Sequence, residues 1–166
     1  MWKKWIIISL VLLVAAATGA AREIEGVDMP ETLRIDGTTV ALNGVGARKV
    51  MFFKIYAGGL YLQEPATSDQ QVIDADAPMA LRLEMLDDVD QAAMKKACFN
   101  GFRNATGNQT EPIKDRMDQF LDSFSEPIKK GDVFEFKYLP QKGTEIYKQD
   151  QLKASLPGLD FKKAMF

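Results

Sequence analysis

Residues 43–62 read Asn-Gly-Val-Gly-Ala-Arg-Lys-Val-Met-Phe-Phe-Lys-Ile-Tyr-Ala-Gly-Gly-Leu-Tyr-Leu and decide how the rest of the chain is interpreted. The first four residues form a glycine-rich pattern that predicts a turn, which would deliver Arg48 onto a strand. β-Branched, aromatic and other apolar residues dominate from Arg48 onward, as is typical of strands. This segment is too long for one strand, so we predict a tight bend near residues 51–53. The pair Gly58 and Gly59 indicates a close backbone approach or a bulge.

More strands are predicted on both sides of this segment. Residues 36–37 are Asp-Gly between two short runs of strand-forming residues, which predicts a hairpin. Apolar and polar side chains alternate over residues 79–85 and again over residues 134–138, the pattern of half-buried strands. A turn at Pro140 is then expected to lead into a return strand.

Two amphipathic helices are predicted between these strands. Apolar residues recur at helical spacing over residues 89–102 and 113–124. The first helix is expected to be capped by Asp87 or Asp88 and the second by Thr110. A final helix closes the chain. The order of strands, two helices, strands and a last helix predicts an α+β fold, in which an antiparallel sheet has its helices packed on one face.

The N-terminus carries an export signal. Two lysines precede an apolar run over residues 5–17, which small residues follow. This order is typical of a signal peptide, with cleavage expected after Ala20 or Ala21. The apolar run is shorter than the roughly 20 residues that a spanning helix needs, so an uncleaved membrane anchor is the weaker alternative. We therefore expect a signal peptide over residues 1–21 and one domain over residues 22–166.

Composition narrows the classes of function. Without the two lysines of the signal, Lys+Arg falls from 21 to 19 against 23 Asp+Glu, a formal charge of −4. This acidic balance, with no basic patch, argues against a nucleic-acid partner and against tight binding to anionic membranes. Histidine is absent, which excludes Ser-His-Asp and Cys-His catalysis in their usual forms. Cys98 is the single cysteine and is expected to be a small buried hydrophobe. We expect no metal site and no cofactor.

Several short motifs occur together and in a specific order along the chain. They are Asn-Gly-x-Gly-x-Arg (residues 43–48), the strand Phe53–Leu62, Gly-Asp at residues 131–132, Tyr-x-Pro-x-x-Gly-Thr at residues 138–144, and Gly-x-x-Phe-x-x-Ala-x-Phe at residues 158–166. With this ordered set the chain resembles the chalcone isomerase family, specifically its bacterial branch with an export signal. The resemblance covers nearly the whole domain.

The resemblance implies an open-faced β-sandwich, in which an antiparallel sheet faces a layer of helices across an apolar cleft. Arg48 matches the arginine that both the isomerases and the fatty-acid-binding members of the family place in this cleft. Tyr56 falls where the isomerases carry a threonine and the fatty-acid binders commonly carry a tyrosine. Arg48 and Tyr56 are therefore the expected ligand-binding residues. The expected cleft walls are apolar: Phe52, Phe53, Met79, Leu81, Met94, Phe102, Met117 and Phe120.

An isomerase of this family also needs a tyrosine and an asparagine on the helix after the strand at residues 79–86. Alignment through Cys98 puts Asp90 and Ala97 at those positions. Neither side chain can do the same chemistry, so no catalytic residue is assigned.

The leading hypothesis is an exported, non-catalytic protein that binds a fatty acid or a similar apolar carboxylate between sheet and helices. The short signal and the resemblance suggest the periplasm of a Gram-negative bacterium, and we expect a monomer. Two alternatives stay open. One is an isomerase of the chalcone isomerase type. The other is a module with a collapsed cleft that binds another protein of the cell envelope.

Overall fold

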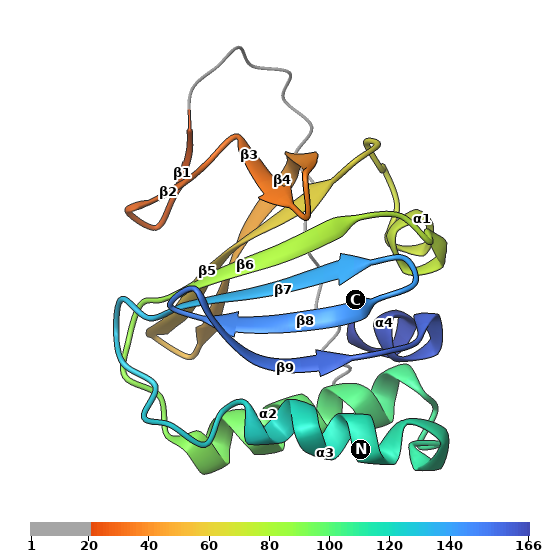
Figure 1. The fold of residues 1–166 in the computed structure, drawn as a ribbon. Helices are drawn as coiled ribbons and strands as arrows, with labels where there is room; N and C mark the ends of the chain where they lie inside the picture. The colour runs from red at the N-terminus through yellow and green to blue at the C-terminus, as the bar shows by residue number, and fades with distance from the viewer. Residues whose placement is uncertain (1–20) are drawn as a thin grey trace, which may run out of the picture.

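The computed structural model describes residues 21–166, which form one curled antiparallel sheet of seven strands, a two-stranded ribbon and four α-helices (Figure 1). The sheet follows chain order, with β3 and β9 at its edges. Its strands are β3 (Thr32–Ile35), β4 (Thr38–Val50), β5 (Phe53–Leu62), β6 (Met79–Met85), β7 (Val133–Leu139), β8 (Gly143–Lys148) and β9 (Gln151–Leu156). The ribbon pairs β1 (Arg22–Ile24) with β2 (Val27–Met29). The α+β architecture with an antiparallel sheet is confirmed.

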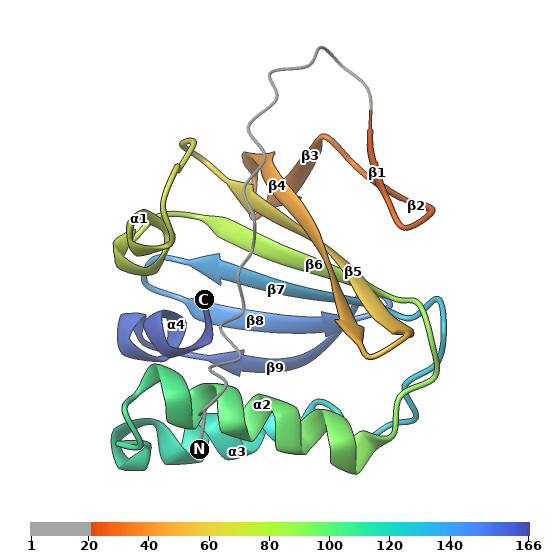
Figure 2. The ribbon, with the colours of Figure 1, turned by 180° about the vertical axis from the view of Figure 1, so that it is seen from behind.

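The helices interrupt the sheet in two places. They are α1 (Asp69–Asp74) between β5 and β6, α2 (Gln91–Ala105) and α3 (Lys114–Asp122) between β6 and β7, and α4 (Leu159–Met165) at the end, with a 3-10 turn at Glu111–Ile113 before α3. In space, α4 lies against β8, α3 against β9, and α2 against both helices (Figures 1 and 2). Within residues 21–166, no helix is both long and apolar enough to cross a membrane.

The predicted bend divides residues 38–62 into the two arms of one hairpin. Strands β4 and β5 pair from Ala41 and Leu62 down to Val50 and Phe53. The expected turn at residues 43–46, however, is wrong, because these residues continue β4. Asn43 is the extra residue of a bulge between the pairs Leu42–Tyr61 and Gly44–Leu60. Its side-chain amide donates to the Ala66 carbonyl (3.1 Å) and accepts from the Ala66 N–H (3.0 Å).

The start of α2 also differs from the sequence-based expectation. Val89 pairs with Ile128 as an isolated β-bridge, so the chain stays extended past Asp87 and Asp88. Asp90 then caps the helix, accepting a hydrogen bond from the Ala93 N–H (2.9 Å). Helix propensity alone does not reveal this delay, because the partner strand segment lies almost 40 residues further along the chain.

The main core lies between the helices and β6–β9. Phenylalanine rings from four elements pack directly on one another. Phe102 of α2 lies 5.1 Å from Phe120 of α3, measured between ring centroids, and Phe120 lies 5.7 Å from Phe136 of β7. Phe161 of α4 lies 5.3 Å from Phe102. At roughly 1.5–3 kcal/mol for each buried side chain, this cluster is a major source of stability.

The ribbon covers the other face of the sheet near β4 and β5. Met29 of the ribbon packs with Ala57 of β5, and both side chains are fully buried. Further across this face, Glu135 forms ion pairs with Arg82 (2.7 Å) and Lys137 (2.6 Å). Burial works to raise the pKa of Glu135, but the hydrogen bonds from these two cations hold it below the ordinary value.

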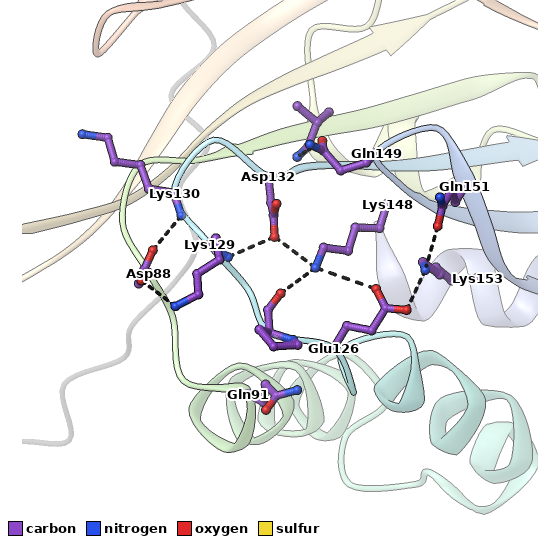
Figure 3. A network of polar contacts seen from close by, with 12 residues as sticks. Asp88, Gln91, Glu126, Lys129, Lys130, Asp132, Lys148, Gln149, Gln151 and Lys153 are labelled. Atoms are coloured by element: carbon purple, nitrogen blue, oxygen red, sulfur yellow. Dashed lines mark hydrogen bonds and ion pairs between the residues drawn. The ribbon is translucent and has the colours of Figure 1, made fainter.

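A polar network ties the start of α2 to the sheet (Figure 3). Asp88 accepts hydrogen bonds from the ammonium of Lys129 (2.8 Å) and from the backbone N–H of Lys130 (2.9 Å). The adjacent Asp132 accepts from the Lys129 N–H (2.9 Å) and pairs with buried Lys148 of β8 (3.0 Å). The loop before α2 is thereby fixed to the loop before β7, which sets where α2 lies over the sheet.

Candidate functional site

Arg48 and Tyr56, the two residues expected to bind a ligand, are direct cross-strand partners on β4 and β5. Both are half-buried. The ladder shifts register immediately beyond them, from the pair Arg48–Tyr56 to the pair Lys49–Lys54, so that Ile55 is the extra residue of a second bulge. Bulges bend a strand and re-aim its side chains, and they are frequent next to functional sites.

Arg48 and Tyr56 interact through their polar ends. Burial raises the pKa of Tyr56, while the positive charge of Arg48 and its hydrogen bond to the hydroxyl act in the opposite direction. The phenol therefore stays protonated at neutral pH and can donate to a further acceptor. Within residues 21–166, the ion pairs formed by acidic side chains do not include Arg48.

Cys98 of α2 is the third member of this site. Burial raises the pKa of its thiol to about 11, and the charge of Arg48 opposes this increase. Its thiol also acts on the pKa of Tyr56, which places the three polar ends in one neighbourhood. The sequence predicts Cys98 as a small buried hydrophobe and does not predict this proximity. A signal was present, since Cys98 is four residues from both Met94 and Phe102 and shares their buried helix face.

A strip of glycines, called the glycine strip below, adjoins Arg48 and Tyr56 on the helix-facing side of β4 and β5. The register places Gly46 opposite Gly58 and Gly44 opposite Leu60, and alternation puts these glycines on the same face as Arg48 and Tyr56. A Cβ added at Gly58 would lie 3.0 Å from a methyl group of Leu83 and 3.7 Å from the Gly46 carbonyl oxygen. The Leu83 side chain therefore packs directly over Gly58, while the glycines contribute no side chains of their own.

The expected cleft walls do not form one surface. Phe52 is 94% exposed and Phe53 is 61% exposed, because both lie at the tip of the β4–β5 hairpin, so their assignment to the cleft is wrong. Leu81 is partly buried against the main core. The other five predicted wall residues are buried, four of them in the main core and Met79 in a separate cluster beside α1. These four are Met94, Phe102, Met117 and Phe120.

The two positions that an isomerase would need are occupied differently. Asp90 is engaged as the cap of α2. Ala97 is exposed on that helix, whereas Cys98 is the neighbour that reaches the Arg48 site. No side chain of the asparagine or tyrosine kind is therefore supplied by α2 at these positions.

Two hollows lie elsewhere on the surface, and Arg48 and Tyr56 are outside both. One, of about 380 Å³, is lined by residues that include Glu25, Lys54 and Lys130. The other, of about 230 Å³, lies between the end of β5 and α1. Within the part of the chain that the structure describes, no three His, Cys, Asp or Glu residues gather in a way that could hold a metal ion.

Comparison with known proteins agrees with this architecture. The crystal structure of a fatty-acid binding protein from Arabidopsis thaliana superposes with a TM-score of 0.65 at 14% sequence identity, over 84% of this chain and 82% of that one. At this identity the likeness establishes the fold. The search of curated protein sequences found no match. The family model described as chalcone isomerase-like matches residues 21–166, so this chain belongs to the chalcone isomerase-like family.

Proposed function

We propose that this protein is an exported, non-catalytic binder of a fatty acid or a similar apolar carboxylate. The ligand's carboxylate is held by Arg48 and Tyr56, and its hydrocarbon chain lies on the glycine strip between β4–β5 and the helices. The observation that carries the proposal is the pairing of a half-buried arginine with a protonated tyrosine beside the glycine strip. The Arabidopsis relative in fold, which is described as a fatty-acid binding protein, supports the same class of ligand.

The chemistry of the three groups fits an anionic head. A guanidinium presents a planar fork of donors that matches the two oxygens of a carboxylate. The Tyr56 hydroxyl adds a donor from the neighbouring strand. A charge-assisted hydrogen bond of this kind contributes about 1.5–3 kcal/mol net. Cys98, protonated at neutral pH, adds no negative charge that would repel the ligand.

Binding alone is favoured over isomerisation by what α2 supplies. Addition of a phenolate to an enone requires groups that hold and stabilise the developing enolate. The helix offers an engaged cap at Asp90 and an exposed methyl group at Ala97 in place of such groups. Chalcone should therefore cyclise in the presence of the protein no faster than in buffer, and a rate well above the buffer blank would support the isomerase alternative.

The direct test is native mass spectrometry of the purified protein together with fatty-acid analysis of an organic extract. Wild type is compared with Arg48→Ala and with Arg34→Ala, a control that removes an exposed arginine from β3. We expect an apolar acid in wild type and Arg34→Ala and its loss in Arg48→Ala at equal thermal stability. An empty protein in all three samples, also after incubation with oleate, would overturn the proposal and favour the protein-interaction alternative.

Export is tested separately. Fractionation of the source cells should place the protein outside the cytoplasm, with an intact mass that begins at Ala21 or Arg22. The predicted signal peptide falls on residues outside those that the structure describes, so this measurement decides it. A cytoplasmic protein that retains Met1 would contradict export and leave the binding proposal unaffected.

A further inference from the structure

The tip of the β4–β5 hairpin exposes a run of four apolar residues. The exposed fractions are 46% for Val50, 84% for Met51, 94% for Phe52 and 61% for Phe53. Water therefore covers two neighbouring phenylalanine rings and a methionine at a projecting turn. Exposed apolar groups gathered in this way commonly mark an interaction surface.

The requirements of the turn do not explain these residues. Val50 and Phe53 are the last pair of the ladder, so Met51 and Phe52 form a two-residue loop. Such loops favour glycine, asparagine or aspartate, because their backbone enters the left-handed region. Met51 has a φ of +55° and adopts that conformation at a steric cost. An apolar pair is thus kept where turn geometry favours small or polar residues.

Cations flank the apolar tip on both strands. Lys49 and Lys54 are opposite each other in the ladder immediately behind it, and their side chains are 51% and 54% exposed. Both ammonium groups pair with one carboxylate, that of Glu25 in the β1–β2 turn, at 2.5 and 2.6 Å. Two lysines against one glutamate leave a local excess of positive charge behind the hydrophobic end of the hairpin.

This order of groups fits the surface of a phospholipid bilayer. Aromatic rings favour the boundary between headgroups and acyl chains, and lysines behind them can reach the lipid phosphates. A bilayer accepts a projecting tip without a complementary groove. The acidic balance of the whole domain disfavours an electrostatic mode of binding, so the apolar tip must supply most of the attraction.

We propose that the hairpin tip enters a phospholipid membrane and that the ligand passes between the bilayer and the site along the same hairpin. The second part rests on the proposed function. Val50 is two residues from Arg48, a distance of about 7 Å along a strand. Phe53 is three residues from Tyr56 on the other arm, with the Ile55 bulge between them. A carboxylate that leaves the headgroup layer beside the inserted tip would meet the guanidinium within one or two strand positions.

Insertion can be measured with a tryptophan placed at the tip. The two natural tryptophans, Trp2 and Trp5, precede residue 21, so the described domain holds none. Phe52→Trp is compared with Leu152→Trp, a matched control on β9 whose native side chain is 54% exposed. Where residues 1–20 remain on the purified protein, the wild-type spectrum is subtracted. Vesicles contain phosphatidylethanolamine and phosphatidylglycerol, with and without lipid that carries a quencher in its acyl chains.

We expect the emission of Phe52→Trp to shift to the blue and to be quenched by the labelled lipid, with neither change in Leu152→Trp. Phe52→Ser should lower vesicle partitioning about tenfold, as expected for one ring withdrawn from the apolar layer, whereas Leu152→Ser should leave it unchanged. Equal quenching at both positions, or none at either, would overturn membrane insertion of the tip. Capture of the tip by a protein, with no effect of vesicles, would do the same.

Transfer is measured with a fluorescent fatty acid that moves from the protein to vesicles. For wild type and Leu152→Ser, the rate should rise with vesicle concentration. Phe52→Ser should transfer about tenfold more slowly at unchanged affinity for the free fatty acid. If the tip inserts but no fatty acid binds, the proposed function and the transfer step fail and membrane contact stands. If binding depends on Arg48 but the rate is independent of vesicles, the transfer step fails and the proposed function stands.

Discussion

Arg48 and Tyr56 face each other across the β4–β5 ladder, one residue before a bulge, with Cys98 of α2 in the same neighbourhood. The same two strands that hold this polar pair carry the exposed apolar tip at their far end. One hairpin therefore combines a half-buried arginine–tyrosine pair with a hydrophobic surface, only a few residues apart.

The first prediction concerns how affinity divides between the head and the chain of a fatty acid. Each methylene buried on the glycine strip should contribute about 0.8 kcal/mol, a factor of about four in the dissociation constant. Arg48→Ala should weaken binding by about 1.5–3 kcal/mol for every chain length. Titration calorimetry with a series of saturated acids measures this. The binding free energy plotted against chain length should give two parallel lines, one for wild type and one for Arg48→Ala. A slope that changes in Arg48→Ala would place the chain somewhere other than beside the arginine.

The second prediction concerns the reactivity of Cys98. A pKa of about 11 instead of 9.0 leaves about one hundredth as much thiolate at pH 8, so alkylation of the folded protein should be about 100-fold slower than that of the unfolded chain. Arg48→Ala removes the charge that lowers this pKa and should slow the reaction further. Because the unfolded thiol loses its proton first, this residue should also reduce stability as the pH rises from about 9 to 11. Mass spectrometry after timed exposure to iodoacetamide follows the reaction, and a folded-state rate equal to the unfolded one would contradict it.

The third prediction concerns a buried lysine of α4 whose ammonium lies against the end of α1. Lys162 is 0% exposed, and its ammonium donates to the carbonyls of Val72, Ile73 (2.9 Å) and Ala75 (2.8 Å). Lys162→Met would leave these carbonyls without their donor, at a cost of about 2–4 kcal/mol in the free energy of unfolding. Lys163→Met is the matched control, since Lys163 is exposed on the same helix and forms a surface ion pair with Asp74 (3.0 Å). Urea unfolding should show a large loss in the free energy of unfolding for Lys162→Met. The loss for Lys163→Met should be less than about 1 kcal/mol.

The fourth prediction contrasts two glycines. Gly143 has a φ of +94°, and an added Cβ would lie 2.2 Å from the Leu156 carbonyl oxygen, a backbone atom that cannot move aside. Gly143→Ala should therefore cost about 3 kcal/mol or more. Gly101 lies inside α2, and no atom beyond the backbone of its own helix lies within 4 Å of an added Cβ, so Gly101→Ala should stabilise by about 0.5–1 kcal/mol. Thermal unfolding should show a lower Tm for Gly143→Ala and a higher Tm for Gly101→Ala. An unchanged Tm in Gly143→Ala would mean that the start of β8 and the end of β9 pack less tightly than the Gly143–Leu156 contact indicates.

Local signals in the sequence identified most of the secondary structure. The Asp36-Gly37 turn has positive φ at both residues, and the alternation over residues 79–85 coincides with β6. Short elements were missed where their signal is weak. Helix α1 has six residues, and β1 and β2 have three each. Such elements depend on packing against the sheet, because few residues provide little intrinsic preference of their own.

Periodicity and ordered motifs are properties of neighbouring residues, so the amino-acid sequence is enough to predict the order of strands and helices and the hairpin bend after Val50. The same ordered motifs predict membership of the chalcone isomerase-like family. Features that depend on partners far apart in the chain become visible only in the folded molecule. Asn43 belongs to a bulge because its amide meets the backbone of Ala66, 23 residues away. Cys98 joins Arg48 because α2 is fixed over the sheet, and the hairpin tip is exposed because no other element of residues 21–166 covers it.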